Sequence, residues 1–325
     1  MKLIDLFGRK INYLRLSVTD RCNMRCSYCM PEHGVDKRSH HEVLSYEELH
    51  RIARAAVSLG IQKIRVTGGE PLVRKDIVPF LAGLSAIPGL KQLVLTSNGM
   101  LLEEMADDLR GAGVQRLNIS LDSLDPAQFC AITRTDNLNR VLAGIAAADR
   151  AGFPVKINMV VMRGVNDAEI EAIASLAIDR PYSVRFIEYM PSSREERWQS
   201  LVMSGREILE RLSARFPLQP LGRGELAGPA KDYRIAGAAG TLGIITPVTG
   251  HFCDSCNRIR VTSTGMAKSC LFSDGQLDLK PFLGESDADQ LEEALRRIVA
   301  GKPGRHEMSA QSANHTPFAM SAIGG

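Results

Sequence analysis

Along the first half of the chain, segments with apolar residues at helical spacing alternate with short apolar runs typical of strands. Helical spacing is clearest after Ser45, where one apolar stripe comprises Leu49, Ile52, Ala53, Ala56 and Val57. Ser45 with Glu48 three residues later is the pattern of a capping box, and Gly60 is typical of a helix end. The pattern therefore predicts a helix that begins after Ser45 and covers a core with its apolar stripe.

Short apolar runs of strand type separate this helix from further helical stretches. They lie at 14–19, 61–67, 93–96, 116–120, 155–160 and 184–188. Strands that alternate with helices of this length indicate right-handed βαβ units and a parallel sheet. The fold class is therefore α/β, and the pattern alone leaves open whether the sheet is doubly wound or forms a partial TIM-type barrel.

Polar and glycine-rich segments follow five of these strands. They are a cysteine-rich loop after the first strand, then Gly68–Pro71, Thr96–Gly99, Ser120–Ser123 and Glu188–Pro191. In parallel α/β folds, ligands gather at the carboxyl ends of strands, so these segments are expected to line one rim. Ordinary βα turns use the same residue types, and this alternative stays open for each segment taken singly.

Length and composition allow one large α/β domain with a smaller appendage. The chain has 325 residues, of which 44% are apolar, enough for a sizeable core. No apolar run approaches the ~20 residues that span a bilayer, and the first residues lack a signal-peptide layout, so a cytoplasmic protein without membrane contact is expected. A net charge of +3 is too small to indicate a nucleic-acid partner.

The seven cysteines fall into two groups of three and a single residue, which is metal spacing rather than a disulfide framework. The groups are Cys22, Cys26 and Cys29, and Cys253, Cys256 and Cys270. Soft thiolates favour zinc, Cu(I) or iron–sulfur clusters, and three ligands leave one coordination position open. For the second group, zinc completed by a fourth ligand such as His251 stays an alternative. Cys130 belongs to neither group and is expected to be a buried, small apolar residue.

The first group, C-x3-C-x2-C with Tyr28 before its last cysteine, resembles the radical S-adenosylmethionine enzymes. This resemblance implies a partial (β/α)6 TIM-type barrel, a [4Fe–4S] cluster on the three thiolates, and S-adenosylmethionine on the fourth iron. It also implies that Gly69, Ser120, Tyr28 and Met190 bind S-adenosylmethionine.

The two cysteine groups, the Gly-Gly-Glu-Pro segment and the sequence Asn257-Arg258-Ile259-Arg260 together resemble the GTP 3′,8-cyclase family of molybdenum cofactor biosynthesis. The resemblance implies a domain at 1–220 and a smaller C-terminal domain at 221–325 that carries a second [4Fe–4S] cluster. It implies GTP contacts from Arg15, Lys63, Arg65, Thr96, Lys156, Arg258 and Arg260.

The residues independently support an anion site. Lys63 and Arg65 alternate on one predicted strand, as do Arg258 and Arg260, so each pair points one way. A rim that collects six cations is costly unless an anion fills it. The sequence has no G-x4-G-K-[ST] loop, so side-chain cations must hold any phosphates.

The family resemblance implies a lyase that converts GTP to (8S)-3′,8-cyclo-7,8-dihydroguanosine 5′-triphosphate. Its implied partners are an electron donor and a downstream cyclic pyranopterin monophosphate synthase, and a homodimer is left open. It implies that Gly324 and Gly325, at the end of the chain, reach into the catalytic cavity. A peptide-modifying radical enzyme and a non-catalytic iron–sulfur electron-transfer module are the alternative functions.

Overall fold

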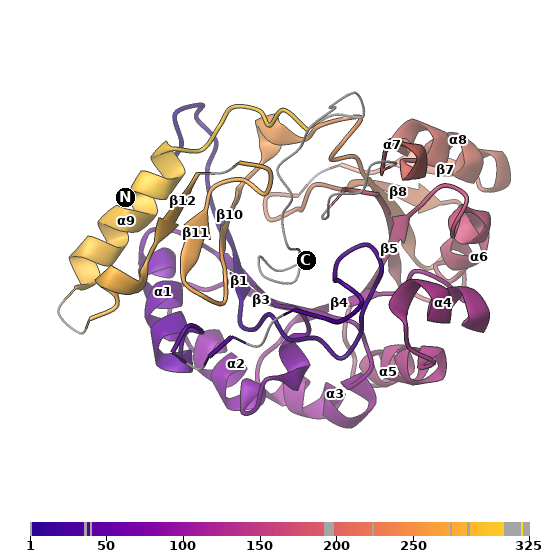
Figure 1. Cartoon of the computed structure of the whole chain (residues 1–325). Helices are drawn as coiled ribbons and strands as arrows, with labels where there is room; N and C mark the ends of the chain where they lie inside the picture. The colour runs from indigo at the N-terminus through magenta and orange to yellow at the C-terminus, as the bar shows by residue number, and fades with distance from the viewer. Residues whose placement is uncertain are drawn as a thin grey trace.

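A single curved sheet surrounds the middle of the molecule, and helices cover its outside (Figure 1). The structure is a computed structural model, and it describes residues 2–35, 38–39, 41–191, 198–222, 224–273, 275–284, 287–308 and 320. In these residues the strand order is β12-β11-β10-β1-β2-β3-β4-β5-β6-β9-β8-β7. From β10 through β1 to β6 and β9 the strands all run parallel to one another, whereas β11 and β8 pair antiparallel with the outer sides of β10 and β9.

The first six strands and their helices form the predicted partial barrel. The strands are β1 (Tyr13–Ser17), β2 (Lys63–Thr67), β3 (Gln92–Ser97), β4 (Arg116–Ser120), β5 (Val155–Val161) and β6 (Ser183–Glu188). The helices are α1 (Tyr46–Ser58), α2 (Ile77–Ser85), α3 (Leu102–Gly111), α4 (Pro126–Thr133), α5 (Leu138–Arg150) and α6 (Ile170–Ser175). Short 3₁₀ turns lie at Pro71–Val73 and Asp167–Glu169. The α/β partial barrel is therefore confirmed.

The rest of the chain extends this sheet at both of its edges. Its elements are α7 (Trp198–Leu201), α8 (Gly205–Arg215), β7 (Leu218–Pro220), β8 (Lys231–Ile235), β9 (Thr241–Ile245), β10 (Arg258–Val261), β11 (Met266–Lys268), β12 (Gln276–Asp278) and α9 (Ala288–Ala300), with 3₁₀ turns at Cys253–Ser255 and Lys280–Phe282. Strand β9 pairs with β6, and β10 pairs with β1. The domain boundary at residue 220 stays a prediction, and strand pairing continues across it.

The period-two alternation of the strands separates an apolar outer layer from a polar interior. Leu14, Leu16, Ile64 and Val66 are fully buried in the main core, whereas their neighbour Arg15 lines a central cavity. Because successive side chains of a strand point to opposite faces, the sheet packs its apolar face against the helices and turns its polar face inward. The barrel interior is thus hollow rather than filled with aliphatic side chains.

Capping boxes mark the start of two helices, and the first lies where the sequence predicts it. The Ser45 side chain accepts a hydrogen bond from the Glu48 backbone, and the Glu48 side chain accepts one from the Ser45 N–H. Ser204 and Glu207 form the same reciprocal box before α8. Each box satisfies two backbone donors that a helix start leaves without partners.

The expected burial of Cys130 is wrong, because its thiol is exposed on α4. The buried face of this helix is formed by Phe129, Ile132 and Thr133, which are spaced as neighbours on one helical stripe. Cys130 follows Phe129 directly and therefore lies off that stripe.

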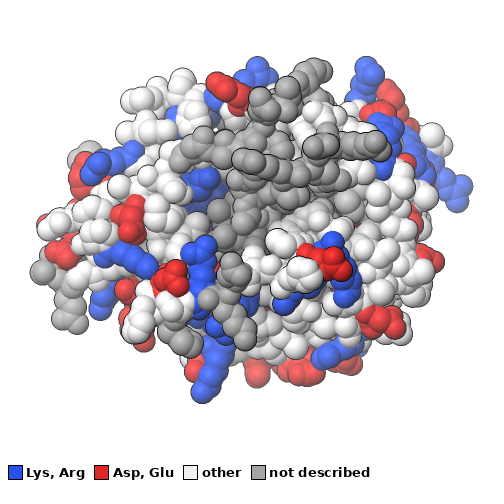
Figure 2. All heavy atoms as spheres, in the orientation of Figure 1, with Lys and Arg blue, Asp and Glu red and all other residues white. Residues whose placement is uncertain are grey.

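Charged side chains of both signs are interspersed around the face shown in Figure 2. Several cations are instead buried, because Arg15, Lys63, Arg185 and Arg260 are all less than 10% exposed. A group of positive charges therefore lies inside the barrel. Among the described residues, no helix is both long and apolar enough to cross a membrane.

Gly144 on α5 tests the packing that fixes the loop after β3. A Cβ at Gly144 would fall on the carbonyl oxygen of Gly99, whereas a Cβ at Gly111 on α3 would meet nothing within 4 Å. Gly144→Ala is expected to lower the free energy of unfolding by about 1–3 kcal/mol through overpacking. Gly111→Ala is expected to raise it by about 0.4–1 kcal/mol through a less flexible unfolded chain. Anaerobic urea denaturation followed by circular dichroism measures both, and equal effects would contradict the packing argument.

Candidate active site

One cavity inside the barrel contains both cysteine groups in its lining. The lining cysteines are Cys22, Cys26, Cys29, Cys253, Cys256 and Cys270. The first group follows β1 and so lies at the carboxyl ends of the parallel strands. In the second group, Cys253 and Cys256 precede β10, and Cys270 follows β11, which is antiparallel to β10. This group therefore lies at the amino ends of the parallel strands. The two groups therefore face opposite ends of one cavity.

The first cysteine loop is held by backbone contacts to the end of α4 and by its own arginine. Arg25 N–H donates to the Thr133 carbonyl at 3.0 Å, and the Arg25 guanidinium donates to the Cys22 carbonyl at 2.6 Å. The Cys22 sulfur accepts hydrogen bonds from the Met24 N–H at 3.4 Å and the Asn98 amide at 3.8 Å. Burial raises the pKa of Cys22 to about 11, so this thiol becomes a thiolate ligand only with a metal or cluster present.

Cys26 and Cys29 form a close thiol pair within this loop. Their mutual hydrogen bond raises the pKa of Cys26 and lowers the pKa of Cys29. Three sulfurs on one short loop, two of them in contact and all lining the cavity, can serve one metal centre.

The Gly-Gly-Glu-Pro segment packs directly on the cysteine loop. A Cβ at Gly69 would collide with the carbonyl of Arg21, and Gly69 N–H donates to the Thr19 carbonyl at 2.8 Å. Glycine is thus required here for the approach of two loops. Its predicted contact with the methionine amino group of S-adenosylmethionine stays a prediction.

Glu70 links its own loop to the loop after β3. Its buried carboxylate accepts from the Leu72 N–H at 3.1 Å, the Ser97 hydroxyl at 3.0 Å and the Asn98 N–H at 2.7 Å. Burial raises the pKa of Glu70 to about 7. Because Asn98 also contacts Cys22, Glu70 indirectly positions the first cysteine group.

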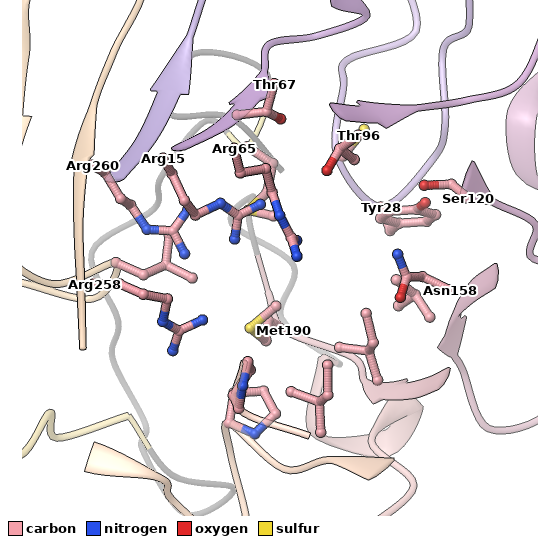
Figure 3. A pocket seen from close by; sticks show the side chains of 18 of the residues that line it. Arg15, Tyr28, Arg65, Thr67, Thr96, Ser120, Asn158, Met190, Arg258 and Arg260 are labelled. Atoms are coloured by element: carbon pink, nitrogen blue, oxygen red, sulfur yellow. The ribbon is translucent and has the colours of Figure 1, made fainter. Parts of the chain in front are cut away.

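Tyr28, Ser120 and Asn158 lie together on one side of the cavity in Figure 3. The Tyr28 hydroxyl donates to Asp122 at 2.8 Å, and the Val160 N–H donates to the same carboxylate at 2.8 Å. Burial raises the pKa of Asp122 to about 6 and raises that of Tyr28 as well. Met190 and Gly69 also line the cavity, so the four residues predicted to bind S-adenosylmethionine all lie in its lining.

Four arginines face them across the cavity, and in Figure 3 their side chains point into it. Arg15 is paired in register with Arg65 on one side and with Arg260 on the other, and Arg258 lies one row nearer the amino ends. The pKa of Arg15 is lowered by burial and by the neighbouring charges of Arg260 and Arg65. The pKa of Arg260 is lowered to about 10 by burial and by the charge of Arg258. Such mutual repulsion marks a site built for an anion.

Lys63 and Lys156 stand beside this arginine row rather than in the cavity lining. The Lys63 ammonium donates to the Leu226 carbonyl at 3.1 Å and lies 4.7 Å from the ring centre of Tyr13. Burial and nearby arginines lower the pKa of Lys63 to about 7 and that of Lys156 to about 6. Thr96, the remaining predicted GTP contact, does line the cavity.

The predicted cations lie within strands, as the alternation predicted, but below the rim to which the sequence assigned them. They occupy inward positions of β1, β2, β5 and β10, toward the amino ends. Alternation correctly places Lys63 and Arg65 on the same face of their strand. Their position along the barrel axis depends on strand register.

The second cysteine group is fixed by two buried cations. The Arg9 guanidinium donates to the carbonyls of Cys253 at 2.8 Å, Gly304 at 3.0 Å and Pro303 at 2.7 Å. The Lys302 ammonium donates to the carbonyls of Arg258 at 2.9 Å and Ser269 at 2.5 Å.

Charge beside this group favours a thiolate. Burial acts to raise the pKa of Cys256, but Arg258 and Lys302 lower it to about 6. Cys256 is therefore ready to bind a metal near neutral pH, unlike the buried Cys22.

Sequence reasoning missed several lining residues, among them Arg9, Asn158, Arg185 and Lys302. Asn158 and Arg185 face inward in register on β5 and β6, and Arg185 is paired with Asp232 at 3.2 Å. Strand alternation could have found these two. Arg9 and Lys302 carry no local signal, because only the folded chain brings them to the cysteines.

Comparison with known proteins agrees with this geometry. A model of the radical SAM superfamily matches residues 16–177, and a Molybdenum Cofactor Synthesis C model matches residues 182–308. The GTP 3′,8-cyclase of Geobacter sulfurreducens is 69% identical over 326 aligned residues and 100% of both chains. The chain belongs to the GTP 3′,8-cyclase family. The Moorella thermoacetica GTP 3′,8-cyclase is 44% identical over 99% of both chains.

Solved structures confirm the fold of this cyclase-family chain. Streptococcus suis SuiB bound to S-adenosylmethionine superposes with a TM-score of 0.61 and 16% sequence identity, over 88% of this chain and 68% of SuiB. At this identity the similarity concerns the fold alone.

Membership in the radical SAM superfamily implies S-adenosylmethionine and a [4Fe–4S] cluster. The first cysteine group fits the cluster, because its three sulfurs line one cavity and receive N–H hydrogen bonds of the kind that stabilise thiolate ligands. Gly324 and Gly325, which were expected to reach this cavity, lie outside the described residues.

Proposed function

We propose that this chain is a radical S-adenosylmethionine-dependent GTP 3′,8-cyclase, a lyase of the first step of molybdenum cofactor biosynthesis. The observation that carries the proposal is the single cavity with a cysteine group at each end and a row of arginines inside it. Such a cavity can hold a second molecule with an anionic group beside S-adenosylmethionine. The 69% identity to a GTP 3′,8-cyclase supports GTP as this second molecule.

The first cysteine group and the loops around it would bind the cofactor. Cys22, Cys26 and Cys29 would hold the cluster, and Tyr28, Gly69, Ser120 and Met190 would contact S-adenosylmethionine. When bound, these groups supply the radical that removes the C3′ hydrogen of GTP, so that C3′ can bond to guanine C8. Asp122 keeps the Tyr28 ring in place by a hydrogen bond to its hydroxyl.

The interior cations would bind the triphosphate. Arginines form forked hydrogen bonds to phosphate oxygens, and four of them point into the same space. Lys63 and Lys156 would add charge from beside the row, and Thr96 would contact the nucleotide. Positioning GTP between the cofactor and the amino-end cysteines is the main contribution of the protein.

The second cysteine group would hold a second [4Fe–4S] cluster whose open iron faces guanine. Three thiols line the cavity there, and the pKa of Cys256 near 6 suits metal binding. The zinc alternative keeps support of its own, because His251 and His306 lie close to Cys253.

Further parts of the proposal rest on the sequence or on the family, not on the geometry of the site. They are the domains at 1–220 and 221–325, the catalytic role of Gly324 and Gly325, an electron donor, a downstream cyclic pyranopterin monophosphate synthase and a cytoplasmic location. A homodimer is left open.

The function is tested by an anaerobic assay with S-adenosylmethionine, GTP and a strong reductant. We expect 5′-deoxyadenosine to form only when GTP is present, together with the cyclised nucleotide. ATP in place of GTP is the matched control and should give neither product. Deoxyadenosine that forms equally without GTP would favour another radical enzyme, and its complete absence would favour an electron-transfer module.

Iron content tests the two clusters. Anaerobically reconstituted protein is expected to bind about eight iron atoms per chain, and the Cys22→Ala, Cys26→Ala, Cys29→Ala triple variant about four. The matching variant of Cys253, Cys256 and Cys270 should also retain about four. Wild-type protein with only about four iron atoms, all lost in the first triple variant, would rule out the second cluster.

The lowered lysine pKa values predict pH-dependent GTP binding. In the free protein the pKa values of Lys63 and Lys156 lie at about 7 and about 6, so Lys63 is about half neutral at pH 7 and both lysines become largely neutral as the pH rises above 8. A bound triphosphate favours the charged form and raises both values, so binding takes up protons. GTP affinity should therefore fall as pH rises, by up to about tenfold per pH unit for each lysine.

Isothermal titration in buffers of different ionisation enthalpy measures this proton uptake. The Lys63→Gln, Lys156→Gln variant should bind GTP with little pH dependence above pH 7. Lys91→Gln, at an exposed position, is the control and should behave as wild type. An affinity of the wild type that is constant from pH 7 to 9 would contradict the argument.

A further inference from the structure

Two histidines meet Cys253 at the edge of the second cysteine group. One ring nitrogen each of His251 and His306 and the Cys253 sulfur all lie within 4.8 Å of one another. His251 Nδ1 and His306 Nε2 are 3.2 Å apart. Zinc bonds of about 2.0–2.1 Å in a tetrahedron place two nitrogen ligands roughly 3.3 Å apart, so the spacing suits one shared ion.

The backbone holds this triad in place from two distant segments. The backbone of His251 has a φ of 30°, in the left-handed region that residues other than glycine rarely adopt. Residues with such backbone strain cluster at functional sites. Arg9 joins the two segments, because it donates to the carbonyls of both Cys253 and Gly304. The triad is therefore assembled before any metal arrives.

Packing also orients His306. Its ring lies 4.5 Å from the Phe272 ring and 4.4 Å from the His251 ring, centre to centre. His306 and Cys253 are each 8% exposed, so their donor atoms are nearly withdrawn from water. A hydrogen bond between His251 and His306 also joins the two rings.

We propose that His251, Cys253 and His306 bind one Zn²⁺ ion when the second cysteine group carries no cluster. Imidazole nitrogen and thiolate sulfur are the ligands that zinc prefers, and three of them leave a fourth position for water. Binding releases the proton of the Cys253 thiol and changes no oxidation state. Cys256 and Cys270 are not needed for this site.

Sharing of Cys253 makes the zinc ion and the second cluster mutually exclusive, a consequence that rests on the proposed second cluster. A cysteine that ligates zinc is withdrawn from the three-thiolate set. Zinc would thus hold the chain in a form that has its first cluster but lacks the second.

Cobalt substitution tests the ligand set in full-length, cluster-free protein in which Cys22, Cys26 and Cys29 are changed to Ala. This background removes the thiols of the first group and also serves for the zinc-binding variants below. Co²⁺ should bind once, with a thiolate-to-cobalt charge-transfer band of the strength given by a single thiolate, and Zn²⁺ should displace it. A band with the strength of three thiolates would show a site made of Cys253, Cys256 and Cys270 and would overturn the proposal.

Matched variants identify the ligands. His251→Gln, His306→Gln and Cys253→Ser should each weaken Zn²⁺ binding by more than about tenfold, since even loss of an outer-shell partner costs 10–100-fold. Cys256→Ser and Cys270→Ser, from the same cysteine group, and His33→Ala, at an exposed position, should bind zinc as wild type does. Circular dichroism confirms the fold of each variant. Loss of binding in Cys256→Ser, or full binding in both histidine variants, would overturn the triad.

Iron reconstitution after zinc loading tests the competition. Wild-type protein preloaded with Zn²⁺ should take up about four iron atoms instead of about eight, and His306→Gln treated in the same way should take up about eight. About eight in both would refute the competition. If wild-type protein without zinc takes up only about four, the second cluster itself is refuted, whereas the zinc site is still decided by the cobalt spectrum.

Discussion

The strict alternation of inward and outward side chains along the parallel strands is the constraint on which the molecule depends. Each strand turns aliphatic residues such as Leu14 and Val66 toward the helices and polar residues such as Arg15 inward. A one-residue slip of register would place the cations in the apolar layer and the aliphatic residues in the cavity. The hydrophobic layer that stabilises the barrel therefore also fixes which residues face the ligands.

Electrostatics inside the cavity follows from the same constraint. Register brings Arg15 level with Arg65 and Arg260, and burial leaves these charges little water to screen them. Repulsion among the cations opposes their charged forms and is relieved when an anion binds. The repulsion thus destabilises the empty protein and strengthens the binding of a polyanion. The lowered pKa values of Lys63 and Lys156 are consistent with this repulsion.

Strand direction separates the two cysteine groups. The first follows β1 at the carboxyl ends, and the second surrounds the start of β10, which pairs in parallel with β1. Parallel pairing of these two strands necessarily places the groups at opposite ends of the cavity, with the arginines in the interior. Arg9 and Lys302 then lock the second group to the N-terminal segment and to the segment after α9. The same locking brings His306 to Cys253, so a metal site of different composition lies within the proposed cluster site.

The sequence by itself determined the α/β class, both capping boxes and the cysteine groups, because these depend on short-range periodicity and spacing. The family resemblance named Arg15, Arg65, Arg258 and Arg260 as GTP contacts, and strand alternation, a local property, placed Arg258 and Arg260 on one face. Only the tertiary structure decided that these cations lie inside the barrel toward the amino ends, that Cys130 is exposed, and that Arg9, Lys302 and His306 join the cysteines. Those outcomes depend on strand register, on the rotation of α4 against its neighbours and on contacts between segments up to 295 residues apart, as between Arg9 and Gly304, which no local pattern encodes.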